Sequence, residues 1–504
     1  MMAHIPVLVV LVPLLTALVL PAINQLLPRI TQAFFKSALL ANVVLAVLAM
    51  RHVVTEGPWH YWLGNWEPPY GIEFVLDAMS ATLVLVAAGM AFVVALYARP
   101  FFNLDEAGME TRTLFYVLFT LMTSGVIGVA IAGDIFTLYV FIEIASISSY
   151  GVVAMGGGRA AFAAYRYLIL GTVAATFYLI GIGLIFAMTG TLNMAQLSEM
   201  LPPLMRSPAI IAGMCFIILG LGTKTAMVPL HSWLPDAHTY GPTPAIAFLA
   251  TALLKAFSYA IYRFMYQIFG GHAQPVTALA LQVLGGLAAA GILYGSVMAI
   301  AQKDFRRMLA YSTIAQISYI PLGIAIGTPA AIAGAALQVI SHSMTKGCLF
   351  MVKGGMHLKL HTTQIDDLGG MSRSMPISSF ALTVSALSMI GLPPTSGFFV
   401  KWQLLRGASA AGLNWMMIVL VLSGLLNAVY FFRILENVFI RKPNQEAHAD
   451  EGPHGAVLGI KPELPLPMLA AMLILTFGIL AVGVGSGWLT EHVFSLIDLA
   501  GGGV

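Results

Sequence analysis

Apolar stretches of about 20 residues recur from one end of this chain to the other, and they restrict it to one kind of fold. A helix needs about 20 mostly apolar residues to cross the hydrocarbon core of a bilayer. Of the 504 residues, 59% are hydrophobic and only 9% are charged, against roughly a quarter charged in soluble domains. The polar surface is too small to coat a water-soluble globule. The sequence therefore predicts an all-α membrane protein.

Fourteen such stretches can be recognised, and we expect each to form one transmembrane helix. Their approximate bounds are 5–23, 31–50, 74–97, 112–132, 133–154, 164–189, 208–226, 243–267, 275–300, 308–326, 330–353, 375–406, 411–433 and 465–488. With fourteen spans the loops alternate between the two sides, and cytoplasmic loops are enriched in Lys and Arg. Sixteen of the 24 Lys and Arg residues fall on one side and four on the other. This sorting predicts that both termini lie on the non-cytoplasmic side.

The remaining four basic residues are lysines inside apolar stretches: Lys224, Lys255, Lys346 and Lys401. A charge at the centre of a bilayer costs about 2.5–3.5 kcal/mol even on the lowest scale, so each of them needs a partner or water. Glu143 is the acidic counterpart, about ten residues into the fifth span. Ionisable residues at membrane depth are by default candidates for an ion path, with a helix-packing ion pair as the alternative.

Prolines should break two of the spans. In the seventh span Lys224 is followed by Pro229 and Pro235, and in the twelfth the run 391–397 contains two glycines and two prolines just before Lys401. Unwound backbone at membrane depth is tolerated only where protein or water covers it. We therefore expect both lysines to lie beside broken helices that border a hydrated path.

The two broken spans are five helices apart, which suggests an internal repeat. Because five is odd, corresponding helices run in opposite directions, as in inverted-topology transporters. We predict two inverted five-helix repeats, helices 4–8 and helices 9–13. The chain then divides into residues 1–110 (helices 1–3), 111–270 (first repeat), 271–440 (second repeat) and 441–504 (a cytoplasmic loop and helix 14).

Between the two broken spans, Gln338, His342 and Lys346 are spaced four residues apart and line one face of the eleventh span. Histidine titrates near neutral pH, and burial disfavours the charged form of any lysine while a nearby carboxylate restores it. Such groups can exchange protons in steps. We predict a proton path through Glu143, Lys224, Lys255, His342, Lys346 and Lys401.

Three polar residues after the first break, His231, Asp236 and His238, are secondary candidates for the same path. No nucleophile with a base, no cofactor fingerprint and no zinc-ligand spacing is present in the sequence, so we expect no catalytic residue, no metal and no cofactor. The formal charge of +3 is small for this length, and no basic patch predicts nucleic-acid binding.

At these residues the chain resembles the antiporter-like proton-translocating subunits shared by respiratory complex I, membrane-bound hydrogenases and multisubunit Mrp cation/proton antiporters. Within that family it is most similar to the D-type subunits of the Mrp antiporters, although a lysine at 401 also resembles the N-type subunit. The resemblance covers most of the chain. It rests on the helix around Glu143 and on the runs 229–236, 241–245, 303–312 and 391–401.

The resemblance implies roles for the candidate residues. Glu143 and Lys224 look like the acid and base of one half-channel, and Lys255 looks like the connecting lysine on helix 8. His342 and Lys346 look like the central relay, and Lys401 like the terminal residue on helix 12. Glutamine at 338, where related chains can carry histidine, does not fit a relay of two histidines on that helix.

Three functions remain open at this point. The first is a non-redox subunit of a hetero-oligomeric Na⁺ or K⁺/H⁺ antiporter in a bacterial-type inner membrane, with other membrane subunits and the lipid bilayer as partners. The second is a proton-pumping subunit of a complex I-type quinone oxidoreductase or a hydrogenase, whose partner chains hold the redox centres. The third is a membrane scaffold that moves no ion.

Overall fold

The computed structural model describes residues 4–104, 108–441 and 463–497. Two strands accompany the helices, β1 (Trp59–Trp62) and β2 (Glu73–Leu76). The α-helices are α1 (Ile5–Leu26), α2 (Thr31–Glu56), α3 (Ala78–Leu104), α4 (Met109–Ile131), α5 (Ile135–Ala154), α6 (Gly158–Thr189), α7 (Met194–Met200), α8 (Pro208–Lys224), α9 (Leu234–Tyr240), α10 (Thr243–Phe248), α11 (Leu254–Tyr262), α12 (Pro275–Ile300), α13 (Phe305–Ile317), α14 (Tyr319–Ile326), α15 (Pro329–Leu360), α16 (Met371–Ser374), α17 (Pro376–Ile390), α18 (Ser396–Ala410), α19 (Asn414–Phe439), α20 (Leu466–Val484) and α21 (Ser486–His492).

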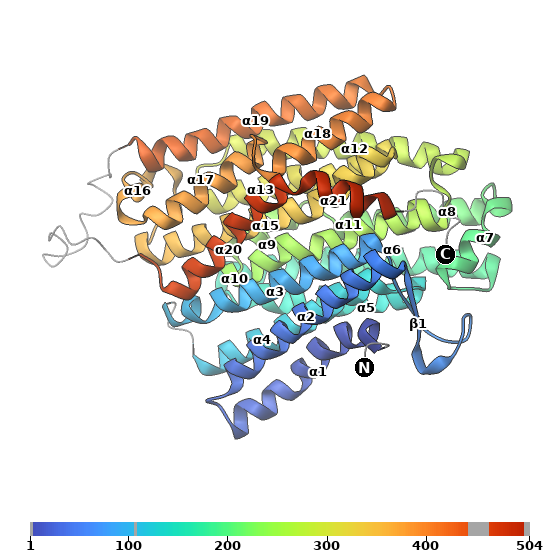
Figure 1. Ribbon diagram of the computed structural model, residues 1–504, viewed down its shortest axis with the longest axis horizontal. Coiled ribbons are helices and arrows are strands. Elements are labelled where there is room, and N and C mark those ends of the chain that lie inside the picture. The colour runs from blue at the N-terminus through green and yellow to red at the C-terminus, as the bar shows by residue number, and fades with distance from the viewer. Residues whose placement is uncertain (1–3, 105–107, 442–462, 498–504) are drawn as a thin grey trace, which may run out of the picture.

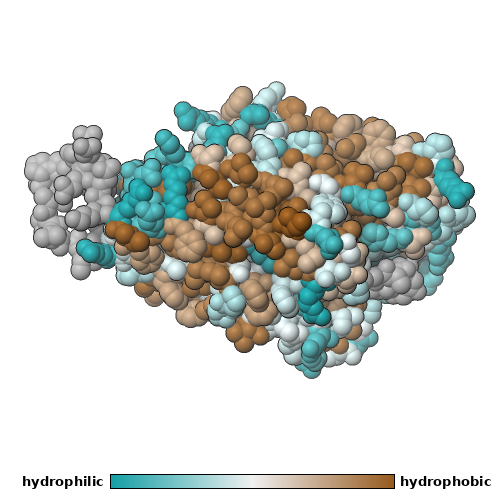
Figure 2. Space-filling view, turned by 90° about the horizontal axis from the view of Figure 1, so that it is seen from above, coloured by the Kyte–Doolittle hydropathy of each residue, from teal (hydrophilic) through white to brown (hydrophobic). Residues whose placement is uncertain are grey.

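The long helices lie side by side along one axis of the molecule, with the N-terminus, β1 and α7 at one end and α16 at the other (Figure 1). Within the described residues, 11 helical segments are long and apolar enough to cross a membrane. Figure 2 shows hydrophobic side chains gathered in the middle of one face and hydrophilic ones toward the two ends. The predicted all-helical membrane fold is confirmed, while the count of fourteen crossings stays a prediction.

The first break follows Lys224, the last residue of α8. The chain then runs through turns, with Ala226 at a positive φ of 58° and Pro229 beyond it, and it resumes as α9 at Leu234 with Pro235 in the first turn. Proline cannot donate the backbone hydrogen bond that a helix interior needs, but it is compatible with the first turn. The predicted break is confirmed, and it leaves Lys224 at the carboxyl end of a half-helix.

The second break separates α17 from α18. Helix α17 ends at Ile390, and Gly391 follows in the left-handed conformation at φ 91°, a position that favours glycine because a Cβ would clash there. Two prolines follow before α18 begins at Ser396. Lys401 lies in the second turn of α18. The lysine thus precedes the break in one span and follows it in the other, as the sequence predicts.

The eighth predicted span is a helix with two irregular turns. All of its most apolar 18-residue window is buried inside the protein. Helix α11 is flanked by π-helical turns at Leu249–Leu253 and Arg263–Ile268. A π-turn inserts one extra residue and rotates the rest of the helix about its axis, and such turns are frequent at functional sites. The regular helix expected over 243–267 is therefore interrupted on both sides of Lys255.

A small β-hairpin precedes α3 and was not predicted, and its second strand is buried against the helices. Strands β1 and β2 pair antiparallel, with Trp59 opposite Leu76. The third predicted span, 74–97, begins too early, because its first residues belong to β2 and the helix starts at Ala78. Asp77 sets this start: its Oδ1 accepts from the backbone N–H of Ser80 (2.7 Å), which caps the helix.

Candidate proton path

Glu143 and Lys224 form an ion pair inside the protein. Lys224 Nζ donates to Glu143 Oε1 at 2.7 Å and to Ser146 Oγ at 2.8 Å. The lysine side chain is 2% exposed and the glutamate side chain 21%. The carboxylate and the end of α8 both stabilise the ammonium, since the carboxyl end of a helix carries partial negative charge. The pairing expected from the sequence is present.

Local structure holds both partners in place. Asp134 caps α5 by accepting from the backbone N–H groups of Phe136 (3.1 Å) and Thr137 (2.6 Å). This fixes the start of the helix that carries Glu143. A third group, Tyr150 Oη, lies 3.4 Å from Lys224 Nζ and was missed in the sequence. Its signal is the spacing: Glu143, Ser146 and Tyr150 are three and four residues apart and share one helix face.

A second group of ionisable residues lies at the centre of the protein. This central cluster consists of His238 on α9, Lys255 on α11, and His342 and Lys346 on α15. All four side chains are at most 1% exposed. The charges of both lysines act on both histidines, so these residues from three helices form one electrostatic unit. The structure thereby brings the secondary candidate His238 together with three of the primary candidates.

Only part of the hydrogen-bonding capacity of the central cluster is used by the protein. Lys255 Nζ donates to the carbonyl oxygen of Ala250 in the π-turn, and Lys346 Nζ donates to that of Leu309 at 2.9 Å. Both ring nitrogens of His238 and of His342 have no hydrogen-bond partner among the residues that the structure describes. Buried nitrogens of this kind need a partner, and water supplies it in most proteins. The cluster therefore has sites at which protons can be taken up and passed on.

Lys401 lies at the second break and contacts the end of α17. Its Nζ donates to the carbonyl oxygens of Ile390 (2.6 Å) and Met389 (3.3 Å). These carbonyls lack a partner within α17 because the helix ends there, and that of Met389 also accepts from Asn427 Nδ2 at 3.0 Å. Among the described residues, no carboxylate lies within salt-bridge distance of Lys255, Lys346 or Lys401. Backbone carbonyls replace at Lys401 the acid that Lys224 has.

A small polar cavity of about 10 Å³ connects the central cluster with the second break. Its lining residues include both His342 and Lys401, together with Gln316, Tyr319 and Gln338. This volume is close to the minimum for one water molecule. Gln338, on the relay face of α15, lines the cavity and donates from Nε2 to Gln316 Oε1 at 3.1 Å. Because a carboxamide does not titrate, Gln338 carries no proton itself.

Two secondary candidates lie away from this line. Asp236 accepts from Arg166 at 2.6 Å and lies 4.0 Å from Arg307. Residues two apart on a helix point about 200° apart, so Asp236 and His238 cannot face the same path. His231 is in the unwound segment, with its ring 4.7 Å from that of Tyr294. The structure thus places His238 in the cluster, Asp236 in an ion-pair group and His231 beside an aromatic ring.

The arrangement can hold and pass protons, and in the described residues no three His, Cys, Asp or Glu side chains are placed to hold a metal ion. Among the described residues, three buried charged side chains were missed: Glu73, Arg263 and Lys353. Arg263, at the end of the eighth predicted span, was counted with the four basic residues of the non-cytoplasmic side. It is 3% exposed and pairs with Asp77 at 3.4 Å. Long basic side chains near span ends usually reach the surface, which is why sequence reasoning did not single it out.

Comparison with known proteins agrees with this description. A family model described as NADH:quinone oxidoreductase/Mrp antiporter, TM, matches residues 132–427. The chain is 44% identical to the N subunit of the NADH-quinone oxidoreductase of Desulforudis audaxviator, over 98% of each chain. It is 31% identical to the D subunit of the Na⁺/H⁺ antiporter of Bacillus subtilis, over 98% of this chain and 96% of that protein.

Solved structures give the same result. A chain of the membrane-bound sulfane sulfur reductase, an archaeal respiratory complex, superposes with a TM-score of 0.88 at 27% identity over 98% of both chains. A chain of the Mrp complex from Dietzia sp. DQ12-45-1b superposes with a TM-score of 0.86 at 24% identity, over 98% of this chain and 96% of that one. The protein belongs to the NADH:quinone oxidoreductase/Mrp antiporter family and is an antiporter-like proton-translocating membrane subunit.

Proposed function

We propose that protons cross this subunit along a line that runs from Glu143 and Lys224, through the central cluster, to Lys401. The observation that carries the proposal is the burial of this series of ionisable side chains. Within the described part of the chain, Lys224 is the only path lysine with a carboxylate partner. Burying unpaired lysines is costly. A scaffold gains nothing from that cost, whereas a proton path needs sites that can change charge.

The Glu143–Lys224 pair is the element that can switch the path. While the carboxylate lies 2.7 Å from the ammonium, the lysine keeps its proton. When the carboxylate moves away, or is itself protonated, the ammonium loses its main stabilising charge and gives its proton to the central cluster. From His342 the small cavity leads to Lys401. Lys401 holds the proton next to the carbonyl oxygens at the end of α17 until it is released.

The complex in which the subunit works has two candidates. The motifs of the sequence favour an antiporter complex, in which inward proton flow drives export of Na⁺ or K⁺ through a companion path. The higher identity to an N subunit of a quinone oxidoreductase (44%) than to an antiporter D subunit (31%) favours the second candidate. That candidate is a non-redox pumping subunit of a redox complex. Both possibilities place the chain among other membrane subunits, without a redox centre of its own.

We propose further that both termini lie on the non-cytoplasmic side of the bacterial or archaeal membrane, as the distribution of Lys and Arg predicts. Purifying the intact complex and identifying its subunits separates the two candidates. Small hydrophobic partner subunits would indicate the antiporter, and iron–sulfur proteins would indicate the redox complex. The two inverted repeats, helices 4–8 and 9–13, also remain a proposal, supported by the positions of the two broken helices.

Transport by the intact complex in vesicles tests the path itself. Lys401→Ala removes the last proton site, and we expect the pH gradient across the membrane to change at a rate at least about a hundredfold lower, as for loss of an essential acid or base. Lys303→Ala is the matched control, since Lys303 is an exposed lysine in a loop. Equal transport by both variants, with normal assembly, would show that the chain is a scaffold.

A further inference from the structure

A larger cavity opens at the end of the molecule that carries the N-terminus, away from the path described above. Its volume is about 310 Å³, with room for on the order of ten water molecules. Exposed His60 and Glu199 are among its lining residues, and so are buried Glu73 and Arg263. His4 Nδ1 lies 2.9 Å from Tyr61 Oη of the hairpin, which places this end on the side of the N-terminus. The cavity leads from the surface toward the interior.

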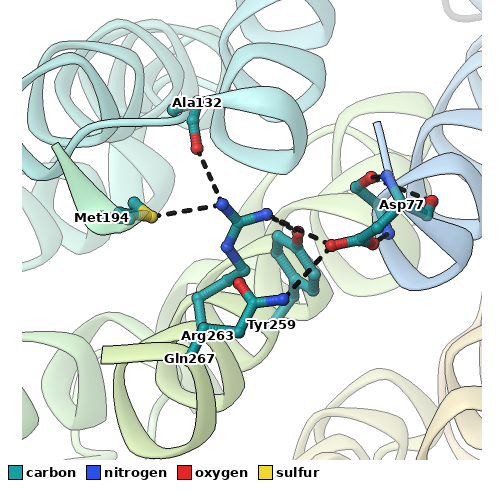
Figure 3. Close-up of polar contacts among 7 residues, drawn as sticks. Asp77, Ala132, Met194, Tyr259, Arg263 and Gln267 are labelled. Atoms are coloured by element: carbon teal, nitrogen blue, oxygen red, sulfur yellow. Dashed lines mark hydrogen bonds and ion pairs between the residues drawn. The ribbon is translucent and has the colours of Figure 1, made fainter. Parts of the chain in front are cut away.

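Arg263 is a buried residue of the cavity lining. Figure 3 shows its guanidinium beside Tyr259, one turn earlier on the same helix, and beside groups from three other segments. The contacts differ in length. It donates to Tyr259 Oη at 2.9 Å, to the carbonyl oxygen of Ala132 at 3.4 Å and to Met194 Sδ at 3.2 Å, and it pairs with Asp77 Oδ2 at 3.4 Å. Ordinary charge-assisted N–H···O bonds are about 2.7–2.9 Å long. The ion pair of Arg263 and Asp77 at the cavity wall is therefore longer than an ordinary charge-assisted bond.

Behind Arg263, one helix face leads to the central cluster. Lys255, Tyr259 and Arg263 are spaced four residues apart on α11 and its following turn, so they lie one above the other. Tyr259 and Lys255 are at most 1% exposed. A guanidinium can only donate hydrogen bonds, so Tyr259 Oη accepts from Arg263, and this bond leaves the tyrosine's own proton unused. Ser80 is the other polar neighbour of the hydroxyl. Tyr259 lies one helical turn from Arg263 on one side and one turn from Lys255 on the other.

We propose that this cavity is a second proton port, which connects the N-terminal side of the membrane with Lys255 through Asp77 and Tyr259. The inference rests on the proposed function in one respect, namely that Lys255 carries protons. In the transfer step, a hydronium ion in the cavity protonates Asp77 Oδ2 and leaves as water, and the pair with Arg263 opens. Asp77 passes its proton to Tyr259 Oη while Tyr259 gives its own proton to a water molecule, which in turn gives one to the neutral amine of Lys255. Asp77 ends as a carboxylate, Tyr259 is unchanged and Lys255 is an ammonium.

Arg263 gives this port its selectivity. Guanidinium stays protonated in proteins, so it cannot carry the proton itself. A fixed positive charge in a narrow passage excludes metal cations, as arginines do in other channels. Protons can still cross this passage, because a carboxyl group and a hydroxyl group can pass them on. Gln267 Nε2 donates to Asp77 Oδ2 at 3.3 Å and holds the carboxylate at the cavity wall when the ion pair is open.

Blocking the cavity from one side tests the port without disturbing the ion pair. The intact complex is assembled with Ser198→Cys, at the cavity wall, in a Cys215→Ser background, because the remaining Cys348 is buried. A cationic, membrane-impermeant thiosulfonate reagent is then added to right-side-out or inverted vesicles. We expect proton transport to fall at least about tenfold when the reagent reaches the side of the N-terminus, and to be unchanged from the opposite side. Ser207→Cys, a partly exposed serine outside the cavity, is the labelling control.

A second pair of variants tests the hydroxyl step. Tyr259→Phe should lower transport at least about tenfold, as for loss of a proton-transfer group. Tyr266→Phe is the control. It removes a buried hydroxyl that donates to the carbonyl oxygen of Ile324 on α14 at 2.8 Å, and this variant should transport protons normally.

The outcomes separate the port from the proposed function. Full transport by labelled Ser198→Cys and by Tyr259→Phe, with Lys224→Ala inactive, would overturn the port and leave the proton path in place. Full transport by Lys224→Ala as well would overturn both.

Discussion

Removing the charge of Glu143 is the sharpest test of the path, because its effect can be worked out from the structure. At the observed 2.7 Å between Lys224 Nζ and Glu143 Oε1, and with an effective dielectric constant near 20, the attraction is about 6 kcal/mol. The glutamate side chain is 21% exposed, and we halve the value for solvent screening to about 3 kcal/mol. Glu143→Gln keeps the shape and an acceptor oxygen but loses this energy. About 3 kcal/mol corresponds to roughly a hundredfold in an equilibrium constant.

We therefore expect Glu143→Gln to lower proton transport about a hundredfold, measured as the decay of a pH gradient in vesicles that hold the intact complex. Two neighbours provide a graded comparison. Ser146→Ala removes a hydrogen bond of 2.8 Å to the ammonium, for which about 1.5 kcal/mol and a tenfold effect are expected. Tyr150→Phe removes a contact of 3.4 Å, too long for a strong bond, so the loss should stay below about threefold. Transport by Glu143→Gln at the wild-type rate, or a larger loss in Tyr150→Phe, would refute the reasoning.

Two further predictions concern stability. Burial raises the pKa of Glu73, but hydrogen bonds from His60, Asn193 and Trp62 outweigh it, and the net pKa lies below its usual value. This stabilisation is present above about pH 4.5 and is lost as the pH falls through the lowered value, so Glu73→Gln should flatten the acid limb of the melting temperature measured in detergent between pH 7 and pH 3. At the second break, a Cβ on Gly397 would lie 1.9 Å from the carbonyl oxygen of Ser388, and Gly397→Ala should cost about 1–3 kcal/mol. Gly286→Ala, on a helix face with open space, is the control and should melt at or slightly above the wild-type temperature.

Much of the fold follows from sequence patterns that do not depend on tertiary contacts. Apolar stretches give the helices, because the bilayer requires about 20 such residues per crossing. Both breaks follow from local chemistry, since proline lacks an N–H and glycine tolerates positive φ. Glu143 and Lys224 could each be recognised as ionisable groups at membrane depth, and their pairing was implied by the resemblance to the antiporter-like subunits.

The remaining features depend on rotation and packing, which hydropathy does not report. Asp236 and His238 are neighbours in the sequence, but only the packing of α9 shows that one meets arginines and the other meets the central cluster. In the sequence Arg263 resembles a residue that reaches the surface. Its burial follows only from its contacts with Asp77 before α3, Ala132 after α4 and Met194 on α7. The hairpin was missed because its strands are four residues long, and short apolar runs merge with the helix that comes next.

The central cluster has a consequence for any attempt to measure one of its members. His238, Lys255, His342 and Lys346 are basic groups whose charges act on one another, so a proton on one discourages a proton on the next. Their titration curves then belong to the set and not to single residues. Spectroscopic titration should give broad curves spread over several pH units, and replacing Lys346 should alter the apparent titration of His238 on another helix. Each proton that arrives therefore weakens the binding of the proton held by a neighbour, so the arriving proton itself helps to displace the one before it.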